Sequence, residues 1–213
     1  AFVMTDARIN FPELHKSLLK GVERTFNRIT VDGDTSTNDM VLVMANGTAE
    51  NTWIDGDSDA DRQIFQDGLE HVLKDLALQI ITDGEGATKT ITIRVSGAKE
   101  EDQAEQIART VATSSLVKTA FFGEDANWGR IMAAMGRSGV KFSPDRVDLA
   151  FGDVVIVKNG LALGKDVEAA ATKVLKERQI TVDIDLHDGK ASAEVWTCDF
   201  SIDYVKINAD YRS

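Results

Sequence analysis

The sequence predicts an α/β fold in which helices and strands pack in layers. Three observations favour it: helix-like and strand-like segments alternate along most of the chain, apolar residues make up 43% of it, and only 2 prolines interrupt it. A length of 213 residues is enough to bury a sizeable core. A single domain over 1–213 and a division into 1–143 and 144–213 both stay open, because the weak boundary near Pro144 is also what a loop would give.

The first half of the chain is expected to hold a strand at 2–4, a helix at 12–28, a strand at 40–46, a helix ending near 81 and a strand around 91–95. Pro12 suits a first helical turn, and apolar residues then recur at three- and four-residue spacing. The segment 40–46 is so rich in apolar residues that we expect both of its faces to be buried. Asp57, Ser58 and Asp59 can cap the second helix.

The second half is expected to hold a helix at 100–113, a short helix within 127–139, strand material at 148–158, a helix at 166–177 and strands at 180–186 and 191–200. The last two strands alternate apolar and polar residues. Asp188-Gly189 lies between them, and Asp-Gly between alternating runs is a strong hairpin signal. We therefore predict that these two strands pair with each other.

The net charge and the cysteine content limit the classes of binding partner and the cellular compartment that we expect. The formal net charge is −11, so a polyanion such as nucleic acid would be repelled. The apolar runs are far shorter than the ~20 residues that span a bilayer, and no signal peptide is recognisable. Cys198 is the only cysteine and is expected to be a packed thiol. We expect a cytoplasmic protein that binds small molecules and other proteins.

The spacing of the side chains gives little support for a metal site or for a Ser-His-Asp catalytic triad. Asp32, Asp34, Ser36 and Asn38 resemble a calcium loop, but Thr37 and Val43 stand where Gly and Glu are required. The acidic set Asp57, Asp59 and Asp61 fails in the same way. The histidines His15, His71 and His187 have no second ligand at metal spacing. No metal site is predicted.

Three polar stretches are harder to explain by a purely structural role. TVDGDTSTND (30–39) crowds hydroxyl, amide and carboxylate groups at a strand entrance. DGEGATK (83–89) sets Glu85 between two glycines, where a backbone can approach a ligand, although these residues by themselves favour a helix end followed by a strand start. In INADYRS (207–213), Ile207 and Tyr211 indicate a docked tail that carries Asn208 and Ser213.

Five stretches in this order identify a resemblance that covers the whole chain: AFVMTDA (1–7), TVDGDTSTND, DGEGATK, GEDANWGR (123–130) and YVKINADYRS (204–213). They resemble the β subunit of bifunctional glutamate N-acetyltransferase, also called ornithine acetyltransferase, of arginine biosynthesis. The resemblance implies a self-cleaving precursor, a fold completed by an α chain, and an α2β2 heterotetramer.

The resemblance also implies the chemistry. The catalytic threonine would stand three places ahead of Ala1, and Thr5 does not replace it. That threonine would carry an acetyl group from N-acetylornithine to glutamate with no cofactor or metal; acetyl-CoA stays open as a further substrate. Glu85, Asn208 and Ser213 match substrate-binding positions, whereas TVDGDTSTND and GEDANWGR are only expected near the site. A related self-processing aminopeptidase or amidase is the alternative.

Overall fold

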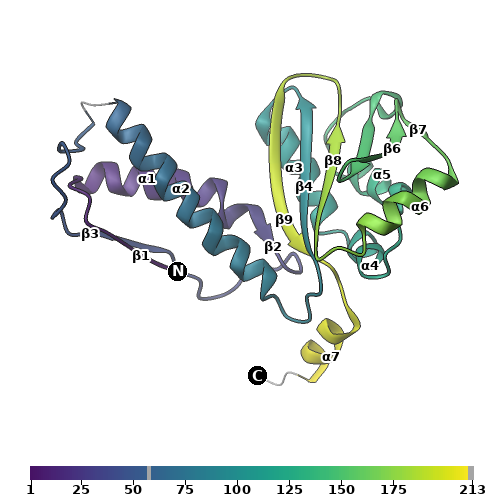
Figure 1. Ribbon diagram of the computed structural model, residues 1–213, viewed down its shortest axis with the longest axis horizontal. Helices are drawn as coiled ribbons and strands as arrows, with labels where there is room; N and C mark the ends of the chain where they lie inside the picture. Colours follow the sequence, from purple (N-terminus) through teal and green to yellow (C-terminus); the bar gives the residue numbers. More distant parts are fainter. Residues whose placement is uncertain (57–58, 211–213) are drawn as a thin grey trace. The chain divides into compact units, whose positions relative to one another are not determined.

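The computed structural model describes residues 1–56 and 59–210 (Figure 1). They form two compact units. Ala1–Ile29 and Thr35–Ile80 make the first unit, and Thr30–Asp34 joins the chain from Ile81 onward in the second. The division considered at residue 144 is therefore not where the compact units meet, because residues on both sides of it share one hydrophobic core.

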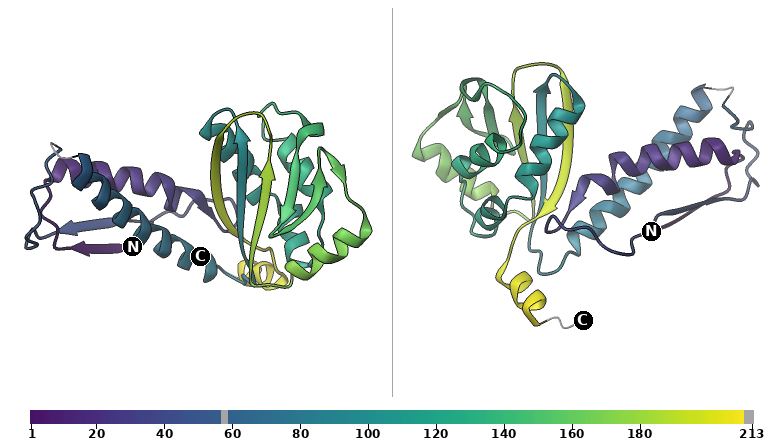
Figure 2. Two further views of the ribbon diagram at one scale, coloured as in Figure 1. Left: turned by 45° about the horizontal axis from the view of Figure 1, so that its top comes forward. Right: turned by 180° about the vertical axis from the view of Figure 1, so that it is seen from behind.

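The first unit is built on a ribbon of two parallel strands, β1 (Phe2–Thr5) and β3 (Leu42–Ala45). Two helices, α1 (Phe11–Arg24) and α2 (Asp59–Thr82), lie on one side of this ribbon (Figures 1 and 2). Val43 packs with Leu69 and Leu73 of α2 in a small core. The strand predicted at 40–46 exists, but the expectation that both of its faces are buried was wrong, since its residues alternate between exposed and buried.

Helix α1 begins where its sequence can satisfy the free backbone groups of a first turn. The side chain of Asn10 accepts a hydrogen bond from the backbone N–H of Glu13 at 2.9 Å, and a proline follows at the start of the helix. The predicted helix 12–28 is confirmed, with a 3-10 turn over Phe26–Arg28. The caps expected at Asp57 and Ser58 lie outside the described residues, and nothing is described of the Asp59 side chain.

The larger sheet of the described chain is mixed, in the order β2-β9-β4-β8-β5-β6-β7, and all of it except Ile29 of β2 belongs to the second unit. Its strands are β2 (Ile29–Thr30), β4 (Thr90–Ala98), β5 (Asp148–Phe151), β6 (Val154–Lys158), β7 (Leu161–Ala162), β8 (Gln179–Asp185) and β9 (Ala191–Cys198). Strands β4 and β8 are parallel, and the pairs β4–β9, β5–β8, β5–β6 and β6–β7 are antiparallel.

Five helices accompany this sheet: α3 (Glu101–Ala112), α4 (Ser115–Phe122), α5 (Trp128–Gly136), α6 (Lys165–Val174) and α7 (Ile202–Asp210). Helix α3 packs against β4 and β9, and α6 packs against β5 and β6. The predicted alternation of Ile91, Ile93 and Val95 is confirmed, because all three are fully buried. The sequence did not predict α4 or α7.

The predicted hairpin of the last two long strands was wrong. Strand β4 lies between β8 and β9 and pairs with both. The connection after β8 crosses the end of β4, where Asp188 N–H donates to the carbonyl of Gly97 at 2.7 Å. A Cβ at Gly189 would lie 2.1 Å from the carbonyl oxygen of Ala98, so only glycine allows this crossing. The Asp-Gly pair therefore serves a crossover instead of a tight turn.

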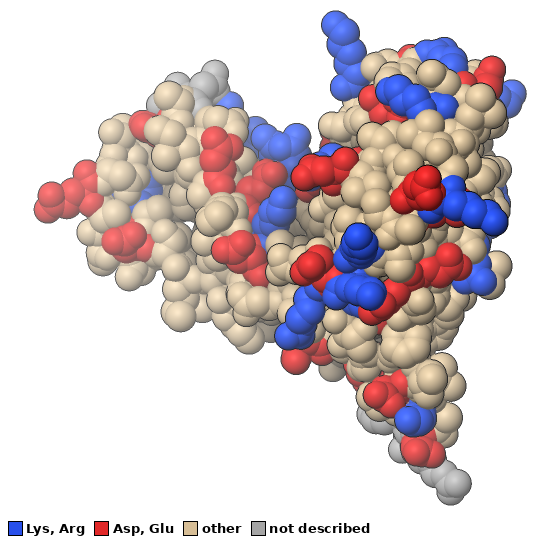
Figure 3. All heavy atoms as spheres, turned by 45° about the vertical axis from the view of Figure 1, so that its right-hand side comes forward, with Lys and Arg blue, Asp and Glu red and all other residues tan. Residues whose placement is uncertain are grey.

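Charged side chains of both signs lie on the surface, and the helices can be checked for membrane-spanning character. On the face drawn in Figure 3, basic and acidic side chains are interspersed, and no broad basic patch covers it. Across residues 1–56 and 59–210, no helix combines the length and the apolar character needed to cross a membrane.

Candidate active site

The loop that carries Glu85 is a tight turn between α2 and β4. Ala87 N–H donates to the carbonyl of Gly84 at 3.0 Å, and Glu85 stands exposed at the tip. Gly86 has φ +65°, and a Cβ there would lie 2.4 Å from the backbone nitrogen of Tyr204. The second glycine of DGEGATK is thus required by backbone conformation and by the close approach of the C-terminal tail.

The tail is docked on this loop through Asp199 and Ser201, which follow β9. The buried carboxylate of Asp199 accepts from Thr88 N–H at 2.8 Å, Thr88 Oγ1 at 2.6 Å and Lys89 N–H at 2.9 Å. Ser201 Oγ donates to the carbonyl of Gly86 at 2.6 Å. Because buried carboxylates need such donors, these bonds define the path of the chain into α7.

Helix α7 places Asn208 directly against Glu85. Asn208 Nδ2 donates to Glu85 Oε2 at 2.8 Å and to the carbonyl of Tyr204 at 3.1 Å. The structure therefore brings together two of the three residues that the sequence predicted for substrate binding. The third, Ser213, lies outside the described residues.

Tyr204, one helical turn before Asn208, links the tail to the TVDGDTSTND segment. Its hydroxyl donates to Asp32 Oδ2 at 2.8 Å. Burial raises the pKa of Tyr204 to about 12, and the hydrogen bond to Asp32 and the charges of Asp32, Glu85 and Asp34 act in the same direction. Tyr204 stays a neutral hydrogen-bond donor at neutral pH, which holds Asp32 in place. We missed its role in the sequence, although it heads the tail motif.

Lys118 is buried and contacts the end of β9, just before Asp199. Lys118 Nζ donates to Thr197 Oγ1 at 2.8 Å and to the carbonyl of Cys198, and it lies 3.8 Å from Cys198 Sγ. Burial lowers the pKa of Lys118, although the negative charges around it, including Asp199, oppose that shift. Burial also raises the pKa of the Cys198 thiol. Cys198 is buried, as predicted for a packed thiol.

The GEDANWGR segment braces α4 and α5 and touches the Glu85 loop. Asn127 Oδ1 accepts from Arg130 N–H at 3.1 Å and so caps α5, while Arg130 Nη1 donates to the carbonyl of Leu116 at 2.9 Å. Lys89 Nζ lies 3.5 Å from Glu124 Oε1. This ion pair places the segment beside the Glu85 loop.

The histidines are engaged at separate places. His15 stacks on Phe11 with ring centroids 5.7 Å apart, and His187 Nε2 lies 2.8 Å from Asp148 Oδ2. His71 lies beside Asp75 on α2. In the described part of the chain, no three His, Cys, Asp or Glu side chains are grouped so that they could hold a metal ion.

Comparison with known proteins agrees with the motifs around this site. The sequence profile of the ArgJ family matches residues 1–213. The chain belongs to the ArgJ family. A Desulfotalea psychrophila protein named arginine biosynthesis bifunctional protein ArgJ is 65% identical over 213 residues. A protein of the same name from Syntrophotalea carbinolica is 52% identical. Each alignment covers 100% of this chain and 54% of the relative, so the chain spans about half the length of these curated relatives.

The fold agrees as well. A crystal structure titled arginine biosynthesis bifunctional protein ArgJ, from Bacillus halodurans, matches with a TM-score of 0.94 at 45% identity. The match covers 99% of this chain and 98% of that chain. The α/β class and the ArgJ-type fold predicted from the sequence are therefore confirmed.

Proposed function

We propose that this chain forms one half of an acetyltransferase that moves an acetyl group from N-acetylornithine to glutamate in arginine biosynthesis. The observation that carries the proposal is membership in the ArgJ family over all 213 residues. The contact between Glu85 and Asn208 supports it, because the two predicted substrate-binding residues meet although they lie 123 positions apart.

The chemistry rests on an N-terminal threonine ahead of Ala1. Its amine has a reference pKa of about 7.7–8.0, so it can accept the hydroxyl proton near neutral pH. The hydroxyl oxygen attacks the acetyl carbonyl, the amide bond breaks, and ornithine leaves with the proton. The amine of glutamate then attacks the acetyl-threonine ester and releases the hydroxyl. One amide replaces another, so this exchange requires no cofactor or metal, and acetyl-CoA would be an additional donor.

Glu85 and Asn208 supply recognition in this scheme. The Glu85 carboxylate is exposed and suits a substrate ammonium group. Asn208 uses its Nδ2 for Glu85 and Tyr204, and no described residue donates to its Oδ1, which leaves an acceptor for a ligand N–H. Ser213 would add a hydroxyl.

A second chain would complete the fold and the site. On the ribbon, Phe2, Met4, Leu42 and Met44 share one exposed face, because Phe2 pairs with Leu42 and Met4 with Met44. A two-stranded sheet with a bare apolar face is marginal in water. We propose that the α chain of the same precursor covers this face and supplies the oxyanion donors, and that two such pairs form an α2β2 heterotetramer in the cytoplasm.

The test is an acetyl-transfer assay with the complete processed enzyme. N-acetylornithine is supplied with and without glutamate, and the products are N-acetylglutamate, ornithine and acetate. We expect N-acetylglutamate and ornithine in equal amounts, only when glutamate is present. Free acetate released equally with and without glutamate would support the aminopeptidase or amidase alternative instead. Mass spectrometry of the β chain then shows whether threonine is its first residue.

A further inference from the structure

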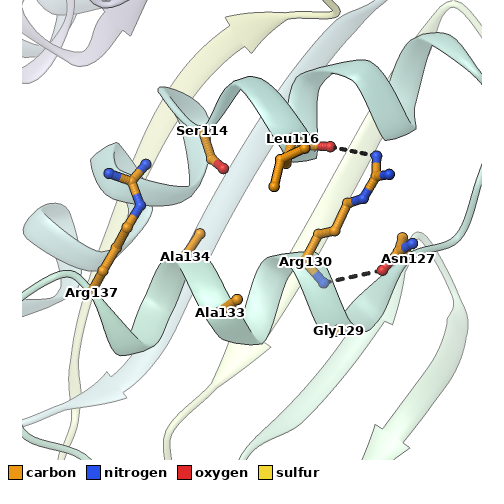
Figure 4. Close-up of a pocket in the computed structure, with 8 residues that line it drawn as sticks. All are labelled: Ser114, Leu116, Asn127, Gly129, Arg130, Ala133, Ala134 and Arg137. Carbon is orange, nitrogen blue, oxygen red and sulfur yellow. Dashed lines mark hydrogen bonds between the residues drawn. The ribbon is translucent and has the colours of Figure 1, made fainter.

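Hydrophobic burial does not hold helix α7 in place. None of its 9 described residues is buried, and among them Tyr204 alone is half-buried instead of exposed. Helix α5 differs, because it buries residues such as Ile131, and Arg130 also joins it to α4 by donating to the carbonyl of Leu116 (Figure 4). A helix as short as α7 is not stable by itself in water. Its position in the described chain therefore depends on polar contacts.

Tyr204 makes four of these contacts, all inside the second unit. Its hydroxyl donates to Asp32 Oδ2 at 2.8 Å, and its backbone N–H donates to Ser201 Oγ at 3.2 Å. Its ring meets the ring of Phe200 edge-on, with centroids 4.7 Å apart. Its carbonyl accepts from Asn208 Nδ2 at 3.1 Å. Residues four positions apart lie on one face of a helix, so Tyr204 and Asn208 share a face of α7.

Asp32 gives the Tyr204 hydroxyl a fixed partner. Asp32 Oδ1 accepts from the backbone N–H of Asp34 at 2.9 Å, and Gly33 N–H donates to Thr30 Oγ1 at 3.0 Å, which closes a turn around Asp32. Thr30 belongs to β2, which lies beside β9 in the larger sheet. The hydrogen bond between Tyr204 and Asp32 therefore joins α7 to the sheet across 172 positions of the chain.

Without this hydroxyl, Ser201 would hold only the start of α7, and Asn208 would meet Glu85 through an exposed side chain. An exposed hydrogen bond competes with water and does not define the orientation of a helix by itself. We propose that Tyr204 is a positioning residue for acetyl transfer: its hydroxyl, bound to Asp32, fixes α7 so that Asn208 stays against Glu85. This inference rests on the proposed function, in which Glu85 and Asn208 bind the substrate.

Hydrogen–deuterium exchange of the complete processed enzyme tests the anchor without any turnover. Tyr204→Phe removes the hydroxyl and keeps the ring. We expect the amides of α7 to exchange faster in this variant, by about fivefold or more, while the amides of β4 keep their parent rates. Thr172→Val is the matched control, because it removes a hydroxyl that donates to the carbonyl of Glu168 within α6. It should leave the exchange of α7 unchanged.

Initial-rate kinetics show whether the anchor serves the site. Tyr204→Phe should raise KM for N-acetylornithine by about fivefold to twentyfold and change kcat by less than about twofold, because a group that positions binding residues acts on binding and not on the chemical step. A purely structural loss would instead reduce the amount of active enzyme, which lowers kcat and leaves KM unchanged. Asp32→Ala removes the same hydrogen bond from its other side and should give the same result.

A double-mutant cycle identifies the residue through which Tyr204 acts. In an enzyme that already carries Asn208→Ala, adding Tyr204→Phe should raise KM by less than about a further twofold, because the side chain that it positions is gone. Two effects on KM that multiply in full would show that Tyr204 acts independently of Asn208.

The inference requires that Tyr204→Phe changes both the exchange of α7 and KM. Parent values of either quantity would overturn it, as would full additivity in the cycle. An enzyme that transfers no acetyl group would refute the proposed function, and the exchange experiment would then still decide whether Tyr204 and Asp32 hold α7.

Discussion

The two compact units differ in how they treat their apolar side chains. In the second unit, α3, β4, β9 and their neighbours enclose a large core in which residues such as Phe121 are almost fully buried. In the first unit, the small core around Leu73 covers only one face of the ribbon, and Phe2 and Met4 on the other face are 65% and 77% exposed. The second unit closes its core with its own chain, whereas the first leaves one apolar face of its ribbon exposed, as surfaces that bind a partner do.

The largest expected effect breaks the closed core. Phe121→Ala should lower the free energy of unfolding of the separately produced chain by about 3–5 kcal/mol, because a filled interior becomes a cavity. Phe2→Ala, the matched change on the exposed ribbon, should cost less than about 0.5 kcal/mol in the same chain. Urea unfolding followed by circular dichroism measures both. Equal losses would show that the ribbon packs as the core does.

The next contrast concerns two glycines, one in each unit. Gly86→Ala should cost about 1–3 kcal/mol of stability and raise KM, because its φ of +65° and its contact with Tyr204 leave no place for a Cβ. Gly68→Ala on α2 meets nothing within 4 Å and should stabilise the chain by about 0.5–1 kcal/mol. Thermal unfolding and initial-rate kinetics separate the two; a gain in stability at Gly86 would contradict the docked tail.

Function should depend on a carboxylate of the second unit and not on one of the first. Glu85→Gln should reduce kcat/KM for N-acetylornithine by about tenfold to a hundredfold, because a neutral amide binds an ammonium more weakly. Glu50→Gln, an exposed matched change in the first unit, should leave the rate unchanged. Gel electrophoresis should show normal self-cleavage in both variants. Failed cleavage in Glu85→Gln would assign that residue to folding or processing.

The smallest expected effect is a pH dependence of stability that comes from Asp148, the first residue of β5. Burial would raise the pKa of Asp148, but hydrogen bonds from Lys158, the Asn159 backbone and His187 outweigh it and lower that pKa from 3.8 to about 2. A lowered carboxyl pKa stabilises the folded state above the unfolded value, and this contribution disappears as the pH falls from 3.8 to about 2.

Asp148→Asn should therefore destabilise the protein at pH 7 by less than about 1 kcal/mol, with the difference shrinking below pH 4, since solvent screens these partly exposed charges. Asp75→Asn in the first unit, beside exposed His71, serves as the matched control and should have no measurable effect. Denaturant midpoints measured at several pH values test both. A difference that grew on acidification would contradict the assigned direction.

Local patterns predicted the helices where the cause lies within the helix itself. Pro12 and the spacing of apolar residues report on neighbours one or two helical turns away, and the two-residue period of Ile91, Ile93 and Val95 identifies strand β4 in the same local way. Helix α4 was missed although Ser114, a residue type favoured at N-caps, precedes it, because its 8 residues are too few for a helical period to stand out in the sequence. Asp199 was missed because one carboxylate after a strand does not reveal three distant donors.

The sequence by itself determined the α/β class, most of the helices, the family, and Glu85 and Asn208 as the residues to examine. These follow from local periodicity and from short motifs that persist in order along the chain. Only the tertiary structure decided that β4 separates β8 from β9, and that Asp199 and Ser201 hold α7 so that Asn208 reaches Glu85. Pairing partners far apart in the chain are selected by burial and by backbone hydrogen bonds of the whole sheet, which no local pattern encodes.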